Sequence, residues 1–179
     1  MNSKFKKIGK NVKIYDTSKL IYPENIEIGN NVIIDDFVLI IAKKRVVIGN
    51  NVHIASYVTI TGNDEFIIED FSGISSGVKI FTSSDDYMGA YLNNPTVLNE
   101  FKNVFTASIN IKKYALVGAN TVVLPGSIIE EGTSIGANSL VNSKTEPYHL
   151  YAGCPIKKLK ARDKNTILKL AEEYRKKYW

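Results

Sequence analysis

The sequence contains very little histidine and cysteine, and this limits the kinds of site it can build. Of its 179 residues two are histidines, His53 and His149, and one is a cysteine, Cys154. Zinc sites take three or four ligands, mostly Cys and His, so we predict no metal site. A lone cysteine forms no internal disulfide and fits a reducing compartment, which indicates the cytoplasm.

Long apolar runs are also missing. No run approaches the roughly 20 residues of a membrane-spanning helix, and the opening segment MNSKFKKIGKNVKIYD has no apolar core typical of a signal peptide. We therefore expect no membrane insertion. The net charge of +5 is concentrated in KFKKIGK, KKLKAR and RKK near the two ends, where solvated termini and anion binding are both open explanations. No nucleic-acid-binding motif accompanies this charge, so we expect no nucleic acid partner.

What the sequence does have is a repeat of aliphatic residues. They return every six positions, with every third step lengthened to eight in the first part of the chain, and the spacing is strictly six after residue 110. The positions are Ile8, Ile14, Leu20, Ile28, Ile34, Ile40, Ile48, Ile54, Ile60, Ile68, Ile74, Ile80, Ile111, Val117, Val123, Ile129, Ile135 and Val141.

This spacing is neither the alternation of an ordinary strand nor the 3.6-residue period of a helix. A small or β-branched residue usually stands four positions after each aliphatic one, and Gly, Asn and Asp cluster between them, as in IGNNV and VGANT. Such a pattern is typical of short strands joined by sharp corners. Three strands close a triangular coil, and stacked coils bury one continuous core. The sequence therefore predicts an all-β fold, a parallel β-helix.

The repeat resembles that of the hexapeptide-repeat acyltransferases, in which an aliphatic residue is followed by Gly, Glu, Asp or Ala and then by a small residue. The resemblance covers roughly Ile8 to Arg162. It implies a left-handed parallel β-helix, a homotrimer with active sites between neighbouring prisms, and acetyl-CoA or another short acyl-CoA as cosubstrate. We assign residues 1–162 to this domain and residues 163–179 to a C-terminal α-helix capped by Asp163 or Asn165.

The segment EPYHLYAGCPIKKLKAR resembles the part that leaves the last coil in these enzymes, next to the adenine and phosphates of coenzyme A. The resemblance implies that basic side chains here bind phosphate and that small coil residues approach the pantetheine arm. The predicted cofactor-binding residues are Gly118, Ala119, Gly136, Ala137, Lys157, Lys158, Lys160 and Arg162. For each of them a purely structural or solvated role is the alternative.

The repeat is interrupted once, by a predicted loop over residues 81–104, FTSSDDYMGAYLNNPTVLNEFKN in its main part. TSSDDY, Asn94-Pro95 and Phe101-Lys102-Asn103 resemble features of the acyltransferases that act on nucleotide-linked amino sugars, including the dTDP-4-amino-4,6-dideoxyglucose N-acyltransferases and sugar acetyltransferases of polysaccharide gene clusters. The resemblance implies an acceptor of this kind, with dTDP as one nucleotide, in surface polysaccharide or O-antigen synthesis. Predicted catalytic residues are Ser84, Asp85 and Asp86, and predicted substrate-binding residues are Asn94, Glu100 and Tyr87.

The loop lacks the histidine that the better-known O-acetyltransferases of this fold use as a base. A hydroxyl needs such a base, whereas a sugar amine, with a pKa of about 8 by analogy with an α-amino group, is partly neutral already. Alignment with the thioester and stabilisation of the oxyanion then suffice. The sequence therefore favours N-acylation.

Two alternatives to an N-acyltransferase stay open, and a third class of protein fits the sequence poorly. An O-acetyltransferase would use Asp86 or His53 as its base, and a non-catalytic β-helix scaffold would use none of these groups. The γ-type carbonic anhydrases share the fold but need three histidines around zinc, and two histidines make this class a poor fit.

Overall fold

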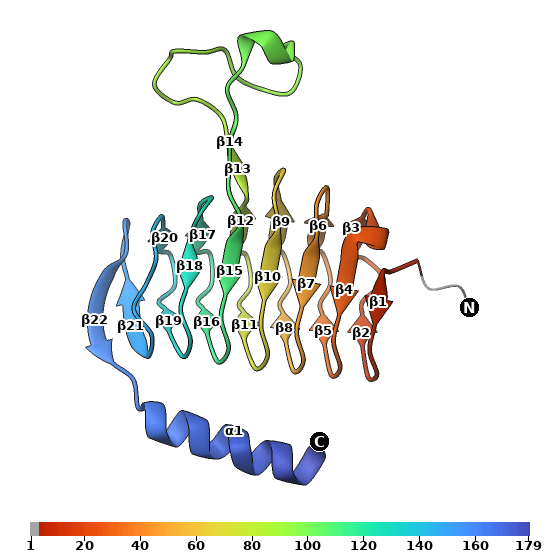
Figure 1. Cartoon of the computed structure of the whole chain (residues 1–179), viewed down its shortest axis with the longest axis vertical. Coiled ribbons are helices and arrows are strands. Elements are labelled where there is room, and N and C mark those ends of the chain that lie inside the picture. Colours follow the sequence, from red (N-terminus) through yellow and green to blue (C-terminus); the bar gives the residue numbers. More distant parts are fainter. Residues whose placement is uncertain (1–3) are drawn as a thin grey trace.

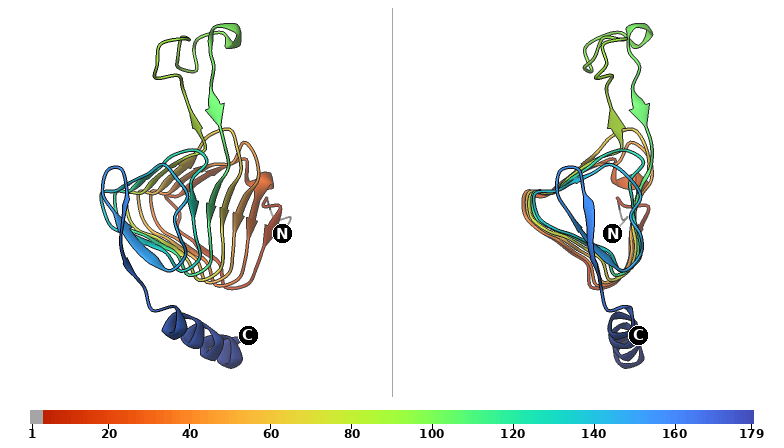
Figure 2. Two further views of the ribbon diagram at one scale, coloured as in Figure 1. Left: turned by 60° about the vertical axis from the view of Figure 1, so that its left-hand side comes forward. Right: turned by 90° about the vertical axis from the view of Figure 1, so that its left-hand side faces the viewer.

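The computed structural model describes residues 4–179; residues 1–3 of the predicted β-helix domain lie outside the described part. The chain winds into a triangular prism of stacked coils, from which a loop rises at one corner while a helix lies along another (Figures 1 and 2). Each coil contributes one short strand to each of three sheets, and the sheets are the faces of the prism. The predicted parallel β-helix is confirmed.

The first two strands of each coil build two of the faces, and every ladder between coils is parallel. The first face contains β1 (Lys7–Ile8), β4 (Ile26–Ile28), β7 (Val46–Ile48), β10 (Phe66–Ile68), β15 (Ile109–Ile111) and β18 (Ile128–Ile129). The second contains β2 (Lys13–Ile14), β5 (Ile33–Ile34), β8 (His53–Ile54), β11 (Gly73–Ile74), β16 (Leu116–Val117), β19 (Ser134–Ile135) and β21 (His149–Ala152).

The third strand of each coil builds the third face, which completes six coils. It contains β3 (Lys19–Ile21), β6 (Leu39–Ile41), β9 (Thr59–Thr61), β12 (Lys79–Phe81), β17 (Val122–Val123) and β20 (Leu140–Val141). The register places equivalent aliphatic residues above one another: Ile28 pairs with Ile48, and Ile48 with Ile68. The repeat of twenty residues is therefore one coil.

The core is the stack of these inward side chains. Ile34, Ile54 and Val117 are fully buried, and so is Val32, one of the small or β-branched residues that precede the strands. In the later coils these positions are taken by hydroxyl residues such as Ser127 and Thr133, which donate to backbone carbonyls. Because those hydroxyls are paired, they enter the core without an unsatisfied polar atom.

The three corners of the prism differ in the residues that form the turn and in the length of the turn, and the long loop leaves from one of them. The first corner, between the first and second strands of a coil, carries a column at positive φ: Asn11, Asn31, Asn51, Phe71 and Tyr114. The second corner carries Phe37, Tyr57, Gly77, Asn120 and Asn138, also at positive φ. The eight-residue steps of the sequence all fall at the third corner, one of them as the 3-10 helix η1 (Pro23–Asn25), and the long loop leaves from this corner as well.

The C-terminal part closes the prism and then runs back along it. Strand β22 (Lys157–Ala161) turns antiparallel onto β21, which the hexad pattern does not predict. The helix α1 (Lys164–Tyr178) follows, with Asp163 as its N-cap accepting from the amide of Thr166. The helix lies against the first corner, where Arg175 packs over the rings of Phe71 and Tyr114.

Candidate active site

The loop is tied to the prism through a short antiparallel neck. Strand β13 (Ser83–Ser84) pairs with β14 (Phe105–Thr106), with Ser84 opposite Phe105. Below the neck, buried Thr82 bonds to the backbone of Asp64 on the preceding coil through its hydroxyl. A Cβ atom on Gly62 would lie 2.2 Å from that hydroxyl oxygen. A glycine is therefore required where the loop base crosses this corner.

Beyond the neck, the loop is ordered by its own turns and by the 3-10 helix η2 (Asn99–Phe101). Asp86 accepts from the amides of Met88 and Tyr91, each at 2.8 Å. Asn94 stands at φ 73° and accepts from the amide and hydroxyl of Thr96. These Asx-type turns are typical of Asp and Asn in tight chain reversals.

A cavity of about 410 Å³ lies between the loop and the third corner of the preceding coils. It brings together three of the predicted residues, Ser84, Asp85 and Asn94. The prism contributes Lys43 and Asn63, whose side chains are bonded at 3.1 Å, and the loop contributes Lys102. The remaining lining residues are Thr61, Gly62, Ser83, Pro95, Asn99 and Val104. This cavity therefore combines hydroxyl, carboxylate, amide and ammonium groups.

The other three predicted loop residues do not line this cavity. The Asp86 carboxylate is used in the loop turn, and the amides of Met88 and Tyr91 hold its pKa below the usual range. The side chain of Tyr87 is 90% exposed, and Glu100 is exposed on η2. Of the three predicted catalytic residues, Ser84 and Asp85 thus line the cavity and Asp86 does not, and their contact with an acceptor stays a prediction.

The predicted pantetheine contacts lie on other coils, next to the second corner. A Cβ atom on Gly118 would lie 2.6 Å from the amide nitrogen of Ala137, and one on Gly136 would lie 2.9 Å from the Cβ of Ala152. Both glycines are thus needed for the close stacking of coils. Ala119 and Ala137 stand beside the corner residues Asn120 and Asn138. Their contact with a cofactor stays a prediction.

The four basic residues at the end of the prism have different surroundings. Lys157 and Lys160 are exposed on β22 without an ion pair among residues 4–179, and Lys158 pairs with Glu146 at 2.7 Å. Arg162 differs because its Nη1 atom donates to the carbonyl of Gly132 at 2.5 Å, and burial lowers the pKa of its guanidinium. Arg162 is thus already engaged by the backbone, whereas Lys157 and Lys160 are available to an anion.

Both histidines lie away from the loop cavity. His53 points outward from β8 on the second face, and His149 on β21 bonds to the carbonyl of Pro147 through Nδ1. Among the described residues, no group of three or more His, Cys, Asp or Glu side chains is arranged to hold a metal ion. None of the helices in residues 4–179 has the length and apolar character to cross a membrane.

Several residues of the cavity were not predicted. Lys43, Thr61 and Asn63 belong to the eight-residue steps of the preceding coils, and they line the cavity because the loop emerges from the same corner. That shared corner is the signal that could have identified them. Lys102 belongs to the Phe101-Lys102-Asn103 motif, but its position in the cavity depends on how the loop folds back, where Leu92 bridges to Lys102.

Comparison with known proteins gives one relative that spans most of the chain. It is the dTDP-4-amino-4,6-dideoxy-D-glucose acyltransferase of Escherichia coli, 38% identical over 91% of this chain and 85% of the relative. No family model matches the chain.

Solved structures of other acyltransferases also match the chain. AntD, an N-acyltransferase from Bacillus cereus solved in complex with dTDP and 3-hydroxybutyryl-CoA, has a TM-score of 0.91 at 35% identity over 97% of this chain and 91% of that one. A maltose O-acetyltransferase from Clostridium difficile 630, at 19% identity and a TM-score of 0.62 over 89% of this chain and 71% of that one, shares the fold.

Proposed function

This chain belongs to the hexapeptide-repeat acyltransferases that include dTDP-4-amino-4,6-dideoxyglucose acyltransferase, and from that premise we propose that it transfers a short acyl group from coenzyme A to the amine of a nucleotide-linked amino sugar. The acyl group is acetyl in the simplest case. The 38% identity over 91% of the chain supports the reaction type. A mutant of AntD has been solved with dTDP-4-amino-4,6-dideoxyglucose and coenzyme A, which supports this acceptor class.

The observation that carries the proposal is the composition of the loop cavity. Lys43 and Lys102 supply two positive charges on its wall, which suits the diphosphate of a nucleotide sugar. Ser84 supplies a hydroxyl oxygen and Asp85 a carboxylate, and both can accept a hydrogen bond from an ammonium or an amine. No histidine lines the cavity among the described residues, so a hydroxyl acceptor would have no imidazole base there.

The reaction then needs alignment more than proton abstraction. The neutral amine, oriented by Ser84 and Asp85, attacks the thioester carbonyl, and the C–N bond forms as the carbonyl becomes an oxyanion. Collapse of this intermediate breaks the C–S bond. The thiolate of coenzyme A takes the surplus proton from the nitrogen, so that amide and thiol are the products. This chain's task is to hold the two substrates together.

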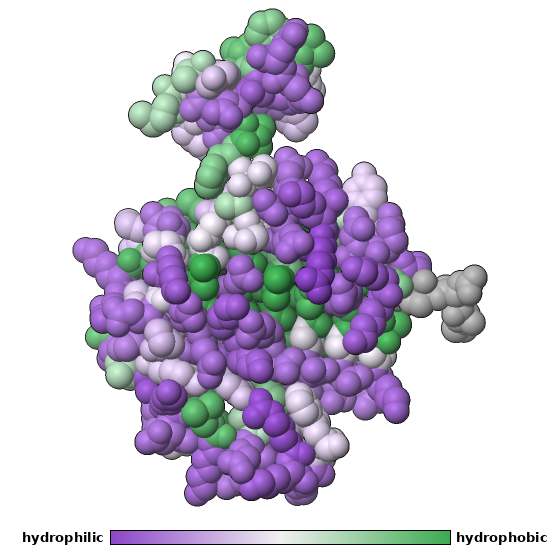
Figure 3. Space-filling model, viewed as in Figure 1, coloured by the Kyte–Doolittle hydropathy of each residue, from purple (hydrophilic) through white to green (hydrophobic). Residues whose placement is uncertain are grey.

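The acceptor and cofactor groups lie apart in one chain, which supports a homotrimer. The loop leaves from the third corner, whereas Ala119 and Ala137 stand next to the second corner. The loop also exposes apolar side chains that need cover (Figure 3). Met88, for example, is 92% exposed. A loop that packs on the neighbouring prism buries these side chains and completes the site. We place the enzyme in the cytoplasm and in surface polysaccharide synthesis.

Subunit complementation tests this arrangement. One variant carries Ser84→Ala and Asp85→Asn in the loop, and the other carries Lys157→Glu and Lys160→Glu on β22. Each alone is expected to be nearly inactive, while refolded or coexpressed mixtures recover about a quarter of the wild-type sites, because each site takes its loop and its cofactor-binding lysines from different subunits. Recovery that never exceeds the sum of the separate variants would contradict the shared site.

A direct assay tests the substrate class. Acetyl-CoA is supplied with a dTDP-linked 4-amino sugar or with the matching 4-hydroxy sugar, and release of free thiol is measured. We expect turnover of the amino sugar alone. Turnover confined to the hydroxy sugar would replace the proposal with an O-acetyltransferase, and the absence of any shift in Tm at saturating coenzyme A would favour a non-catalytic scaffold.

A further inference from the structure

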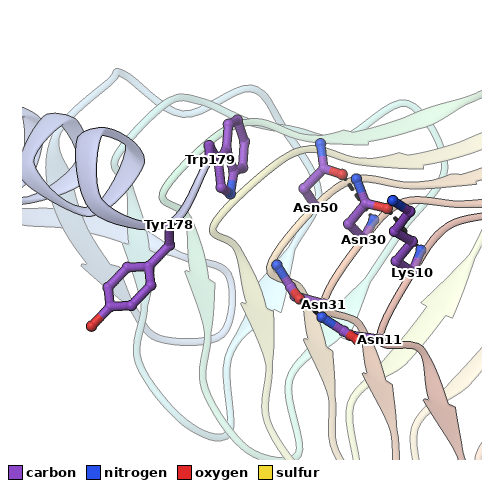
Figure 4. A pocket seen from close by; sticks show the side chains of 7 residues that line it. All are labelled: Lys10, Asn11, Asn30, Asn31, Asn50, Tyr178 and Trp179. Atoms are coloured by element: carbon purple, nitrogen blue, oxygen red, sulfur yellow. Dashed lines mark hydrogen bonds between the residues drawn. The ribbon is translucent and has the colours of Figure 1, made fainter.

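A second cavity, of about 440 Å³, lies at the first corner of the prism, between the early coils and the C-terminal end of α1. The loop leaves the prism at a different corner (Figure 1). Two columns of side chains form its floor: Asn11 and Asn31 in one, and Lys10, Asn30 and Asn50 in the other. Tyr178 and Trp179 complete the lining. In Figure 4 the indole of Trp179 stands across a gap from Asn50, while the ring of Tyr178 points away from both columns.

The wall formed by Trp179 is the end of a stack of rings. Phe71 stacks on Tyr114 of the next coil, with centroids 5.7 Å apart. Phe71 also stacks on Trp179, with centroids 5.5 Å apart and planes inclined by 23°. Arg175 packs over all three rings. The indole is thus held in a fixed orientation, yet it remains 57% exposed and borders the cavity. A flat ring that enters there can extend the stack.

The two columns leave polar groups free to form hydrogen bonds with the edge of such a ring. The side chain of Asn31 accepts from that of Asn11 and donates to that of Asn51, each at 3.0 Å. The side-chain Oδ1 atom of Asn30 accepts from the backbone amide of Lys10 at 2.8 Å. Within residues 4–179 this leaves the Asn30 Nδ2 donor and the side-chain Oδ1 acceptor of Asn11 without a protein partner. Paired amide donors and acceptors beside an aromatic face match the hydrogen-bonding edge of a nucleobase.

The charge around the cavity favours a phosphorylated ligand. The Lys10 ammonium has no ion pair within residues 4–179, and Lys7 lines an adjoining groove that shares Asn50. No Asp or Glu side chain is among the described residues that line the cavity, and Glu27, which lines the adjoining groove with Lys7, is paired with Lys6 and Arg45. Two lysines that form no ion pair within the described residues at one end, and an aromatic wall at the other, fit a phosphate chain and a base.

From this arrangement we propose that the cavity binds a nucleoside diphosphate, with its base stacked on Trp179, the base edge at Asn30 and Asn11, and its phosphates at Lys10 and Lys7. The site is separate from the loop cavity and does not depend on the proposed acyl transfer. Free nucleoside diphosphate, a nucleotide sugar and the adenine nucleotide of coenzyme A all carry the required chemistry.

Trp179 is the single tryptophan of the chain, so its fluorescence reports directly on this cavity. We expect TDP and ADP to quench the emission of the full-length protein with saturation in the millimolar range or below, and thymidine to bind at least fivefold more weakly because it lacks phosphates. Parallel titrations with TDP, dTDP-glucose, ADP and coenzyme A distinguish the sources. Absence of quenching by all four up to 10 mM, or equal quenching by glucose, would overturn the proposal.

Variants locate the binding. Asn30→Asp keeps the acceptor for the Lys10 amide but replaces the free donor with a negative charge, so the Kd for TDP is expected to rise at least tenfold. Lys10→Glu should have a similar effect, whereas Lys19→Glu on β3 makes the same charge change on another face and should have none. Circular dichroism and Tm confirm that each variant is folded.

A loop variant separates this site from the proposed active site. Lys102→Glu is expected to lose acyl transfer and to keep the quenching of Trp179, and equilibrium dialysis should then count one TDP fewer per chain than in the wild type. Loss of quenching in Lys102→Glu would show a single shared site and overturn the proposal. Failure of the acyl-transfer assay with intact quenching would leave the nucleotide site standing on its own.

Discussion

The Nε2 atom of His53 lies 2.8 Å from the Oδ2 atom of Asp35 on the preceding coil, on the second face of the prism. This pair has the geometry in which a carboxylate orients a histidine base. This geometry favours the O-acetyltransferase alternative. His53, together with Ile33 and Tyr174, lines an apolar cleft between α1 and the prism, and neither His53 nor Asp35 lines the loop cavity.

If the proposed amine acylation is right, His53 is dispensable for chemistry. We expect His53→Asn to keep kcat within about threefold of the wild type, whereas loss of a general base typically costs about 10²- to 10⁴-fold. Steady-state kinetics between pH 6 and 9 check this. The decline of kcat at low pH is expected to persist in the variant, because it reports protonation of the sugar amine. A loss of more than a hundredfold would revive the hydroxyl-acylating alternative.

Asp85 and Asp86 are adjacent in the sequence, but we expect substitution of Asp86 to open the loop and substitution of Asp85 to lower activity. Asp86→Asn leaves one carbonyl oxygen for two backbone amides, so the loop should open and become sensitive to limited proteolysis between residues 86 and 94. Asp85→Asn should lower kcat at least tenfold without changing the proteolysis pattern. Increased cleavage in Asp85→Asn, or an unchanged pattern in Asp86→Asn, would reverse the assignment of the two roles.

The pKa of Asp86 gives a matching pH prediction. A carboxyl whose folded pKa is lowered stabilises the folded loop fully above its unfolded pKa of about 4, and this contribution is lost as the pH falls through the folded value. The loop of the wild type should therefore be equally resistant to proteases from pH 5 to 9 and should loosen only below about pH 4. Hydrogen exchange of the Met88 and Tyr91 amides, measured across that range, provides the test.

The prism was predictable because its cause is local and repeated. Ile28, Ile48 and Ile68 fall in register because the early coils share a length of twenty residues, and the six-residue spacing within every coil accounts for eighteen strands. Ser84 and Asp85, which line the loop cavity, were predicted from residue type and family resemblance. Lys43 was missed because it reaches the cavity only through the shared corner, and the Trp179 wall depends on where α1 docks. The docking of α1 leaves no trace in local periodicity, whereas the eight-residue steps mark the corner that Lys43 shares with the loop.

The two kinds of glycine in the coils should respond differently to alanine. In Gly118→Ala the new Cβ would lie 2.6 Å from the amide nitrogen of Ala137 and 2.7 Å from the carbonyl oxygen of Ile135. Backbone cannot yield as a side chain does, so we expect destabilisation of about 1–3 kcal/mol, seen as a fall in Tm of about 2–4 °C per kcal/mol. Gly73→Ala meets only the Leu116 Cδ1 atom, at 3.5 Å, and should leave Tm nearly unchanged.

This pair also tests the predicted pantetheine contact at Gly118. If its role is coil stacking alone, the Kd for coenzyme A, measured at a temperature where both variants are folded, should match the wild type. A weaker affinity in Gly118→Ala with an unchanged Tm would instead support a direct cofactor contact.

Arg162 and Lys160 both lie in the basic segment that resemblance assigns to coenzyme A, and the structure separates them. Arg162→Met removes a donor from the Gly132 carbonyl, and since hydrogen bonds to charged groups contribute about 1.5–3 kcal/mol, Tm should fall clearly. Lys160→Met removes an exposed ammonium without a partner among the described residues, so Tm should not change.

The affinity for coenzyme A should respond in the opposite way, with the larger loss in Lys160→Met. Lys160→Met is expected to raise the Kd several-fold, with a weaker salt dependence than the wild type, because one phosphate contact is lost. A Kd that rises only in Arg162→Met would mean that the guanidinium leaves the Gly132 carbonyl to bind the cofactor.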